Sequence, residues 1–234
     1  MLTLENMLIR QDGFELRADL TVPQGARVAV IGPSGAGKST LLSVIAGFQD
    51  VAGGRVRLDG QDISALAPGK RPVSVLFQDN NLFPHLTVQQ NVGLGLRPDL
   101  RLDAAQRARV AQAIARVGLA GLESRKPGQL SGGQQSRAAL ARVLVQNRAL
   151  VLLDEPFAAL GPALKSEMLD LVQELLAETG ATLLLVTHDP RDAQRIAPQT
   201  ILVADGVAQG PVDTGALFAD PPLALRDYLG QTKP

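Results

Sequence analysis

The stretch that decides the fold of this chain runs Val28-Ala29-Val30-Ile31-Gly32-Pro33-Ser34-Gly35-Ala36-Gly37-Lys38-Ser39-Thr40. Its first four residues predict a buried strand, and the rest fits the pattern GxxxxGK[ST] that leads into a helix. The glycines let backbone N–H groups turn toward phosphate oxygens, the start of the helix adds the positive end of its dipole, and Lys38 adds a full charge. We therefore predict a site for a nucleoside triphosphate rather than a glycine-rich turn without a ligand. The residues predicted to bind it are Gly32, Pro33, Ser34, Gly35, Ala36, Gly37, Lys38, Ser39 and Thr40, with Ser39 as a ligand of Mg²⁺.

Three further apolar runs predict strands of the same kind, at Val73 to Phe77, Leu150 to Leu153 and Leu183 to Val186. None alternates strictly between apolar and polar residues, which favours parallel strands covered on both faces. Between Pro162 and Gly180, apolar residues recur at helical spacing, with proline at a first helical position and glycine just past the end. A weaker helical pattern covers Ala104 to Val117.

The N-terminal part has a different pattern, with near-alternating segments at Leu2 to Ile9, Phe14 to Val22 and Arg55 to Leu58. These segments predict antiparallel strands. The predicted fold is α/β: a phosphate-loop core with a mainly parallel sheet, an antiparallel β subdomain and an inserted α-helical subdomain. We expect a single domain over 1–234, in which 1–82 and 147–234 form the core and the β subdomain and 83–146 form the helical subdomain.

Composition excludes several classes of protein. Of the 234 residues, 45% are apolar, which is enough for a buried interior. The 23 Lys and Arg balance 23 Asp and Glu, so no global positive field attracts nucleic acid, and no nucleic-acid partner is expected. Cysteine is absent, which excludes disulfides and thiolate metal sites. No signal peptide is recognisable, and the apolar run from Thr40 to Phe48 is too short to span a membrane.

Two carboxylates, Asp154 and Glu155, follow directly after the predicted strand Leu150 to Leu153. Ligands of open α/β sheets collect at the carboxyl edge of the strands, where the phosphate loop also lies. We predict that Asp154 holds Mg²⁺ through water and that Glu155 polarises the water that attacks the γ-phosphate. Without the phosphate loop, a strand-ending surface turn would be an equally good interpretation of this pair.

Two other strands end in polar side chains. His188 follows the strand that ends at Val186, where its imidazole could contact the γ-phosphate and hold the attacking water. Gln78 ends the run Val73 to Phe77, and its amide could touch Mg²⁺ or that water. Each would more often be structural if it stood alone. Together with Lys38 and Glu155 they complete the predicted catalytic set.

Far from the phosphate loop in sequence lies Leu130-Ser131-Gly132-Gly133-Gln134, ahead of the helical run Ala138 to Val145. Ser131 and Gln134 match the S-x-x-Q capping box, and the glycines leave backbone amides free at the positive end of the helix. Since the chain already has a complete phosphate loop, a second anion-binding helix end is best explained by contact with the nucleotide of another subunit.

In this order, the motifs GPSGAGKST, Gln78, LSGGQ, Asp154-Glu155-Pro156 and His188 resemble those of ABC-transporter nucleotide-binding subunits over practically the whole chain. LSGGQ is the most specific of them. The resemblance implies a homodimer that holds two ATP molecules head to tail with Mg²⁺. Gly35, Gly37, Lys38, Ser39 and Thr40 would then hold phosphates and Mg²⁺, and Gln78 would link the nucleotide state to the permease. The residues implied to contact the ATP of the opposing subunit are Ser131, Gly132, Gly133 and Gln134.

The segments AGFQ, RPVSVLFQDNNLFPHLTVQQNVGLGL, DEPFAALGPAL and VADG are similar to those of the ATP-binding subunits of bacterial thiamine importers. This likeness implies an integral membrane permease that docks near Phe83 to Val92, a periplasmic thiamine-binding protein, and a place on the cytoplasmic face of the inner membrane. Three alternatives stay open: an importer of another small solute, an ABC-type assembly ATPase, and a phosphate-loop kinase. The kinase is the weakest, because LSGGQ and Glu155 have no obvious use in it.

Two departures from the family pattern matter. Gly161, in the segment Ala158 to Gly161, stands where the family usually has an aspartate that helps couple the two nucleotide sites, so cooperativity could differ. Where the family commonly stacks adenine on an aromatic residue, this chain has Ile9, Arg10 and Gln11. Phe14 by ring stacking and Arg10 by its guanidinium are the two candidates for that role.

Overall fold

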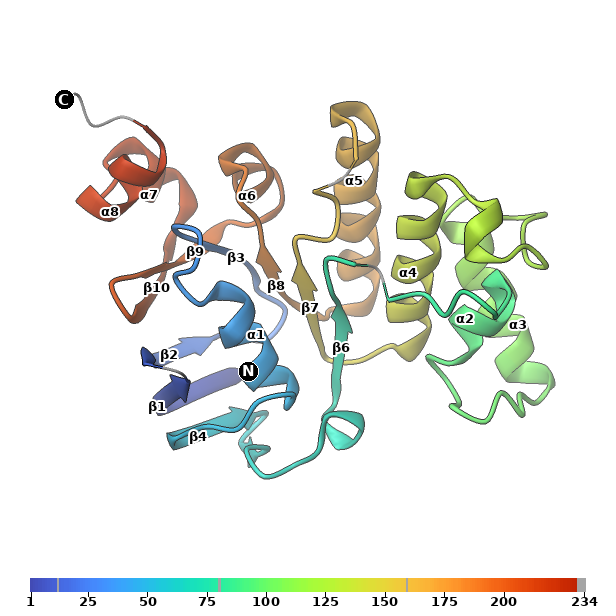
Figure 1. Cartoon of the computed structure of the whole chain (residues 1–234), viewed down its shortest axis with the longest axis horizontal. Coiled ribbons are helices and arrows are strands. Elements are labelled where there is room, and N and C mark those ends of the chain that lie inside the picture. Colours follow the sequence, from blue (N-terminus) through green and yellow to red (C-terminus); the bar gives the residue numbers. More distant parts are fainter. Residues whose placement is uncertain (12, 80, 159, 231–234) are drawn as a thin grey trace.

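The computed structural model describes residues 1–11, 13–79, 81–158 and 160–230. Its main feature is one continuous sheet, with a group of helices beyond one end of it (Figure 1). In the described part of the chain, ten strands form this sheet in the order β5-β4-β1-β2-β10-β9-β3-β8-β7-β6. Their bounds are Leu2–Gln11 (β1), Phe14–Val22 (β2), Arg27–Ile31 (β3), Gly53–Leu58 (β4), Gln61–Asp62 (β5), Val73–Leu76 (β6), Leu150–Asp154 (β7), Thr182–Val186 (β8), Gln199–Ala204 (β9) and Val207–Asp213 (β10).

The four apolar runs predicted as parallel strands are confirmed. β6 pairs with β7, β7 with β8 and β8 with β3, all in parallel. A fifth parallel strand, β9, lies on the other side of β3 and is absent from the prediction. The apolar run Ile201 to Ala204 carries the same signal as the others, and it is buried in the same way.

The parallel strands are apolar throughout because both of their faces are covered. In β3, Val28 and Val30 point into a cluster that includes the helix α1 (Lys38–Ala46). Ala29 and Ile31 point to the opposite face, which α5 (Pro162–Thr179) and α6 (Pro190–Ile196) cover. A fully buried aliphatic side chain stabilises a fold by about 1.5–3 kcal/mol, so this two-sided burial anchors the strand that carries the phosphate loop.

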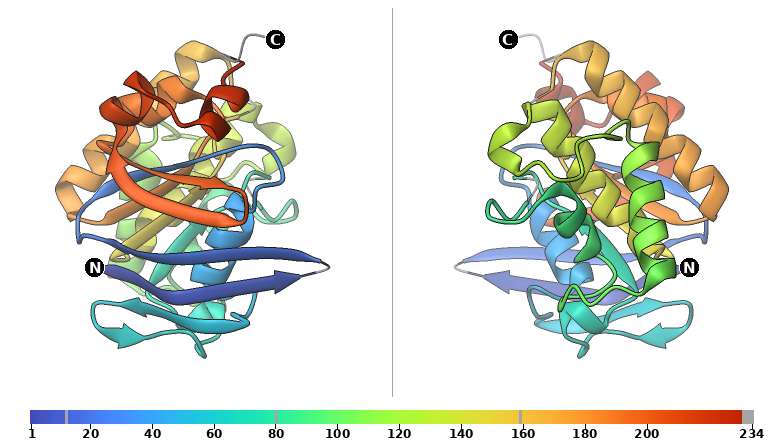
Figure 2. Two further views of the ribbon diagram at one scale, coloured as in Figure 1. Left: turned by 90° about the vertical axis from the view of Figure 1, so that its left-hand side faces the viewer. Right: turned by 90° about the vertical axis from the view of Figure 1, so that its right-hand side faces the viewer.

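The N-terminal strands are antiparallel, as predicted, since β1 pairs with β2 on one side and with β4 on the other. They do not form a separate sheet. β10 pairs in parallel with β2 and antiparallel with β9, and so joins both halves into one surface (Figure 2). The sheet therefore curls around α1, whose apolar side chains pack with those of β1, β2 and β4.

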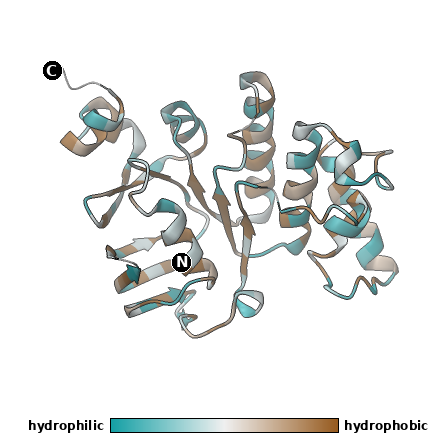
Figure 3. Ribbon diagram, viewed as in Figure 1, coloured by the Kyte–Doolittle hydropathy of each residue, from teal (hydrophilic) through white to brown (hydrophobic). Residues whose placement is uncertain are grey.

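Three helices, α2 (Val88–Gly93), α3 (Ala104–Arg116) and α4 (Gly132–Gln146), lie beyond the β6 edge of the sheet (Figures 1 and 2). They pack around an apolar cluster of their own, in which Val92, Val110 and Ile114 are fully buried. Hydrophilic and apolar residues both occur along these helices (Figure 3), and the exposed positions of α3 are alanine, arginine and glutamine. This cluster supports the proposed helical subdomain, whose borders at 83 and 146 stay a prediction.

The predicted ends of α5 are confirmed, because Pro162 is its first residue and Gly180 ends it in the left-handed conformation at φ 64°. After β10 come two short helices, α7 (Thr214–Ala219) and α8 (Leu223–Tyr228). Leu225 of α8 is fully buried in the cluster formed with α5 and α6, so the C-terminal segment is docked on the core. Across the described ranges, no helix combines the length and the apolar character needed to cross a membrane.

Candidate functional site

The phosphate loop lies between β3 and α1, as the sequence predicts. Gly37 precedes α1 with φ 98°, a conformation that favours glycine, and a Cβ atom there would come within 2.5 Å of Phe14 Cζ and displace that ring. No side chain caps the start of α1. The first backbone N–H groups of the helix therefore lack a side-chain partner, which is the arrangement that binds an anion.

Lys38 lies within the loop with its side chain folded back on the backbone. Its Nζ donates hydrogen bonds of 2.8 Å to the carbonyl oxygens of Gly32 and of Pro33. Burial lowers the pKa of Lys38, while the nearby charges of Glu155 and Asp154 act in the opposite direction. The loop thus holds a desolvated cation that a phosphate group would stabilise.

Asp154 is the last residue of β7 and is only 8% exposed. The Ser39 hydroxyl donates a 3.0 Å hydrogen bond to its Oδ1. Burial raises the pKa of Asp154, and the hydrogen bond from Ser39 opposes that shift only in part. A buried carboxylate beside a hydroxyl is a set of oxygen donors that a divalent cation would satisfy.

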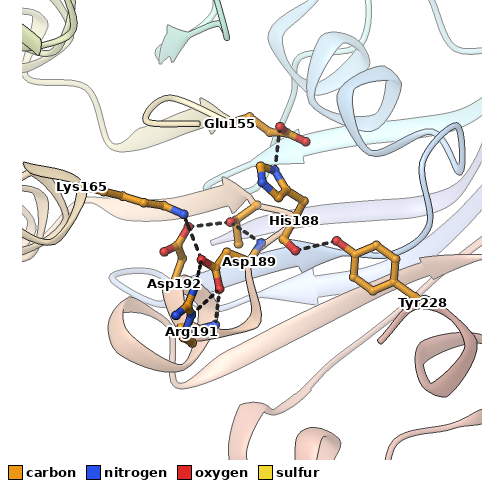
Figure 4. A network of polar contacts seen from close by, with 8 residues as sticks. Glu155, Lys165, His188, Asp189, Arg191, Asp192 and Tyr228 are labelled. Carbon is orange, nitrogen blue, oxygen red and sulfur yellow. Dashed lines mark hydrogen bonds and ion pairs between the residues drawn. The ribbon is translucent and has the colours of Figure 1, made fainter. Parts of the chain in front are cut away.

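Glu155 follows β7 and His188 follows β8 (Thr182–Val186), and their side chains meet at the carboxyl ends of these two neighbouring strands (Figure 4). The pairing of Asp154 with Val186 across β7 and β8 places the residues that follow both strands side by side. His188 Nδ1 lies 3.0 Å from Glu155 Oε2. Glu155 has a positive φ of 45°, and its backbone N–H donates to the Val186 carbonyl at 3.1 Å, so the turn that aims this carboxylate is tied to β8.

A cleft of about 500 Å³ opens over the loop. It brings together the phosphate loop, Gln78 from the end of β6, and Glu155 from the end of β7, as the strand-end argument predicts. The lining residues are Gln11, Phe14, Ser34, Gly35, Gly37, Lys38, Ser39, Thr40, Gln78 and Glu155.

The segment 131–134 does not line this cleft. Its predicted capping box is confirmed: Gln134 N donates to Ser131 Oγ at 3.3 Å, and Ser131 N donates to Gln134 Oε1 at 3.0 Å. Ser131 and Gly132, at the start of α4, are exposed. One copy of the chain therefore presents a second helix start to the outside, separate from its own phosphate loop.

The two candidates for stacking adenine differ in position. Phe14 lines the cleft and packs against Gly37. Arg10 does not line it, and its Nε donates to Glu15 Oε2 at 2.9 Å. Gly161 precedes α5 without a side-chain cap, and Ala159 in the same segment lies outside the described residues.

Two residues that belong to no sequence motif contact the segment around His188. The Tyr228 hydroxyl donates to the His188 carbonyl at 2.7 Å, and Lys165 pairs with Asp189 and Asp192. Neither residue follows a buried strand or a glycine pattern, so the sequence carries no signal that connects them with the site.

Comparison with known proteins agrees with this geometry. A family model described as ABC transporter matches residues 16–158. The chain is 66% identical over 230 residues to the thiamine import ATP-binding protein ThiQ of Cereibacter sphaeroides, covering 98% of this chain and 100% of that protein. It is 62% identical to the protein of the same name from a Ruegeria species, with the same coverage.

Solved structures show the same fold. The dimeric ATP-binding cassette MJ0796 in a post-hydrolysis state bound to ADP and Pi superposes with a TM-score of 0.80 at 30% identity, over 92% of this chain and 99% of that one. A second dimeric structure of that cassette gives the same values.

Proposed function

The chain belongs to the ABC transporter family, and from that premise we propose that it binds and hydrolyses ATP as the motor subunit of an importer. One observation carries the proposal. The phosphate loop, Asp154, Glu155 and His188 converge at one edge of the sheet, while Ser131 presents a capped helix start away from it. A phosphate-loop kinase would have no use for that outward helix start.

Each group in the cleft has a separate role in the reaction. Backbone N–H groups of the loop and Lys38 bind the β- and γ-phosphates. Glu155 accepts a proton from the water that attacks the γ-phosphate, and the bond from phosphorus to the β–γ bridging oxygen breaks. His188, beside Glu155 at 3.0 Å, keeps the carboxylate and the γ-phosphate in register.

Mg²⁺ fits the residues present. Ser39 and Gln78 would be direct ligands and Asp154 would bind through water, and a cation would relieve the cost of the buried Asp154 carboxylate. Mg²⁺ commonly takes one or two protein groups and fills the remaining positions with phosphates and water. When bound, it neutralises charge on the β- and γ-phosphates.

Two copies would complete each site. Ser131, Gly132, Gly133 and Gln134 of one copy would face the γ-phosphate held by the other, because their amides lie at the start of α4 and outside their own cleft. The dimeric state of the similar cassette bound to ADP and Pi supports this arrangement.

Phe14 is proposed as the residue that stacks on adenine. We expect Phe14→Ala to weaken ATP binding about five- to 150-fold, because stacking on an aromatic ring contributes about 1–3 kcal/mol per base. Arg10→Ala is the matched control and should change the affinity less than twofold, because Arg10 lies outside the cleft. Titration of both variants with a fluorescent ATP analogue measures the difference. A larger loss in Arg10→Ala would assign the role to Arg10.

The solute proposed for the importer is thiamine. Relatives named as thiamine import ATP-binding proteins are 51–66% identical to this chain over most of its length, and those from Cereibacter and Ruegeria are covered completely. The partners would be an integral permease and, indirectly, a periplasmic thiamine-binding protein, with this chain on the cytoplasmic face of the inner membrane. The permease would dock at 83–92, where Phe83 exposes 47% of its surface.

Reconstitution tests this function directly. ATP hydrolysis by the chain with its permease in lipid vesicles should rise severalfold when thiamine-loaded binding protein is added, and not when the unloaded protein is added. Stimulation by a different solute would redirect the assignment to another small-solute importer. Failure to copurify with any integral membrane protein would instead favour an ABC-type assembly ATPase.

A further inference from the structure

The imidazole of His188 is poorly held by its own surroundings. Its side chain is 55% exposed, and its hydrogen-bond contact is with Glu155, the carboxylate that it is proposed to keep in register. With so few contacts of its own, the ring is placed chiefly by the main chain that carries it. The position of His188 therefore depends on what holds the main chain from 187 to 189.

The peptide unit that joins His188 to Asp189 is held by both of its polar groups. Tyr228 Oη donates to the His188 carbonyl oxygen at 2.7 Å, and the Asp189 N–H donates to Thr187 Oγ1 at 3.1 Å (Figure 4). The first of these contacts joins residues 40 positions apart. It ties the histidine segment to α8, which Leu225 anchors in the core.

Thr187 is held by a hydrogen bond to Asp192, which is itself in an ion pair with Lys165. Thr187 Oγ1 donates to Asp192 Oδ2 at 2.8 Å, and Lys165 Nζ of α5 lies 2.6 Å from Asp192 Oδ2 and 3.2 Å from Asp189 Oδ2. Lys165 and Asp192 are 16% and 10% exposed, so water screens this pair weakly. The pKa of Asp189 falls to about 2, first through its hydrogen bond with Arg191, and Asp189 therefore stays ionised at neutral pH.

At the His188 carbonyl itself the contact is the hydrogen bond from Tyr228, which adds to the ion pairs of the neighbouring Asp189. Tyr228 is the single tyrosine of the chain. Burial raises its pKa, and the charges of Glu155 and Asp189 act in the same direction, so the phenol stays protonated and remains a donor. A phenylalanine would keep the ring and lose only this contact.

We propose that Tyr228 is a positioning residue for ATP hydrolysis: its hydroxyl fixes the His188 carbonyl, and the docked C-terminal helix α8 thereby sets the histidine ring against Glu155. The proposal rests on the proposed hydrolysis of ATP by this site. It gives the C-terminal segment a part in the reaction although no sequence motif lies in it.

Kinetics of the full-length chain test the proposal. We expect Tyr228→Phe to lower kcat about three- to tenfold with KM for ATP unchanged, because one hydrogen bond is lost and the phosphate loop is untouched. In a His188→Ala background, the same substitution should have no further effect, since residues that act through one another are not additive. Independent, multiplying losses would overturn the proposal.

Thr214→Val is the matched control. It removes another hydroxyl of the C-terminal segment that donates to a backbone carbonyl, Thr214 Oγ1 to Ala197 at 2.7 Å, and that also contacts Thr200 Oγ1 at 2.8 Å. Thr214 lies next to the start of β9, away from the carboxyl ends of the strands that carry the site. Its kcat should stay at the wild-type value. An equal loss in this control would mean that general loosening of the segment explains the effect, and would overturn the proposal.

A second measurement does not depend on activity. The chain has two histidines, so its histidine ring NMR signals are few, and His188→Ala identifies which belong to His188. In Tyr228→Phe the His188 signals should shift or broaden, while those of His85 stay as an internal reference and Thr214→Val leaves both unchanged. Unchanged His188 signals would overturn the proposal. A wild-type chain that hydrolyses no ATP, alone or with the permease, would overturn the proposed function, and these signals would still decide whether Tyr228 positions His188.

Discussion

Glu155→Gln is expected to lower ATP hydrolysis by about 10²–10⁴-fold while leaving ATP binding close to wild type, because a positioned general base contributes a factor of that size. The amide has nearly the shape of the carboxylate but cannot accept the proton of the attacking water. The backbone of Glu155, which donates to Val186, is unchanged by the substitution, so the turn after β7 should keep its form.

With hydrolysis blocked, ATP should hold two copies together. Gel filtration or small-angle scattering should then reveal an ATP-dependent dimer of Glu155→Gln that ADP does not support. Glu174→Gln, which makes the same chemical change at an exposed position of α5, is the matched control and should behave as wild type. Turnover in Glu155→Gln equal to that of the control would contradict the role of Glu155 as base.

The second large effect is expected from Ser131→Asp. Aspartate caps a helix as well as serine does, so α4 should stay intact. The added carboxylate would, however, face the γ-phosphate of ATP held by the opposing copy, and like charges at close range oppose each other by several kcal/mol in a desolvated interface. We expect hydrolysis to fall at least a hundredfold, with ATP binding by the single copy unchanged.

A matched control for Ser131→Asp exists in the same chain. Thr87 caps α2 with the same capping box, formed with Gln90, and Thr87→Asp should leave ATP hydrolysis by the isolated chain unaltered. Full activity of Ser131→Asp in a strictly monomeric preparation would disprove the composite site.

Mixing Ser131→Asp with the inactive Lys38→Ala adds a positive test. A mixed dimer combines the phosphate loop of one variant with the intact Ser131 of the other in one of its two sites. Random mixing should therefore restore up to about a quarter of the wild-type activity, half of the dimers being mixed and each having one intact site.

Much of the site could be predicted from the sequence because it is built from the ends of strands. Apolar runs at Val28, Leu150 and Thr182 identify parallel strands, and parallel strands bring their carboxyl ends to one edge whatever connects them. That rule places Glu155 and His188 at the same edge, and the pairing of β7 with β8 brings them into contact. The capping box at Ser131 is local in the same way, because four consecutive residues suffice to form it.

Three features were beyond this reasoning. The prediction omitted β9 and β10 and therefore treated the antiparallel strands as a separate sheet. The choice between Phe14 and Arg10 depends on which side of β1 and β2 faces the loop and on the ion pair that draws Arg10 to Glu15. Lys165 and Tyr228 lie in ordinary helical sequence, and nothing in their neighbours indicates a role.

The sequence by itself determined which groups the candidate site contains: a phosphate loop, two adjacent carboxylates, a histidine and a capped glycine pair, each placed by local periodicity or by the end of a strand. Tertiary structure alone decided how the sheet closes around α1, which aromatic ring enters the cleft, and how Tyr228 and Lys165 hold the histidine segment. The physical reason is one of range. Capping and periodicity act within a few residues of the chain, whereas a hydroxyl that meets a carbonyl 40 residues away does so because the whole packed core brings the two together.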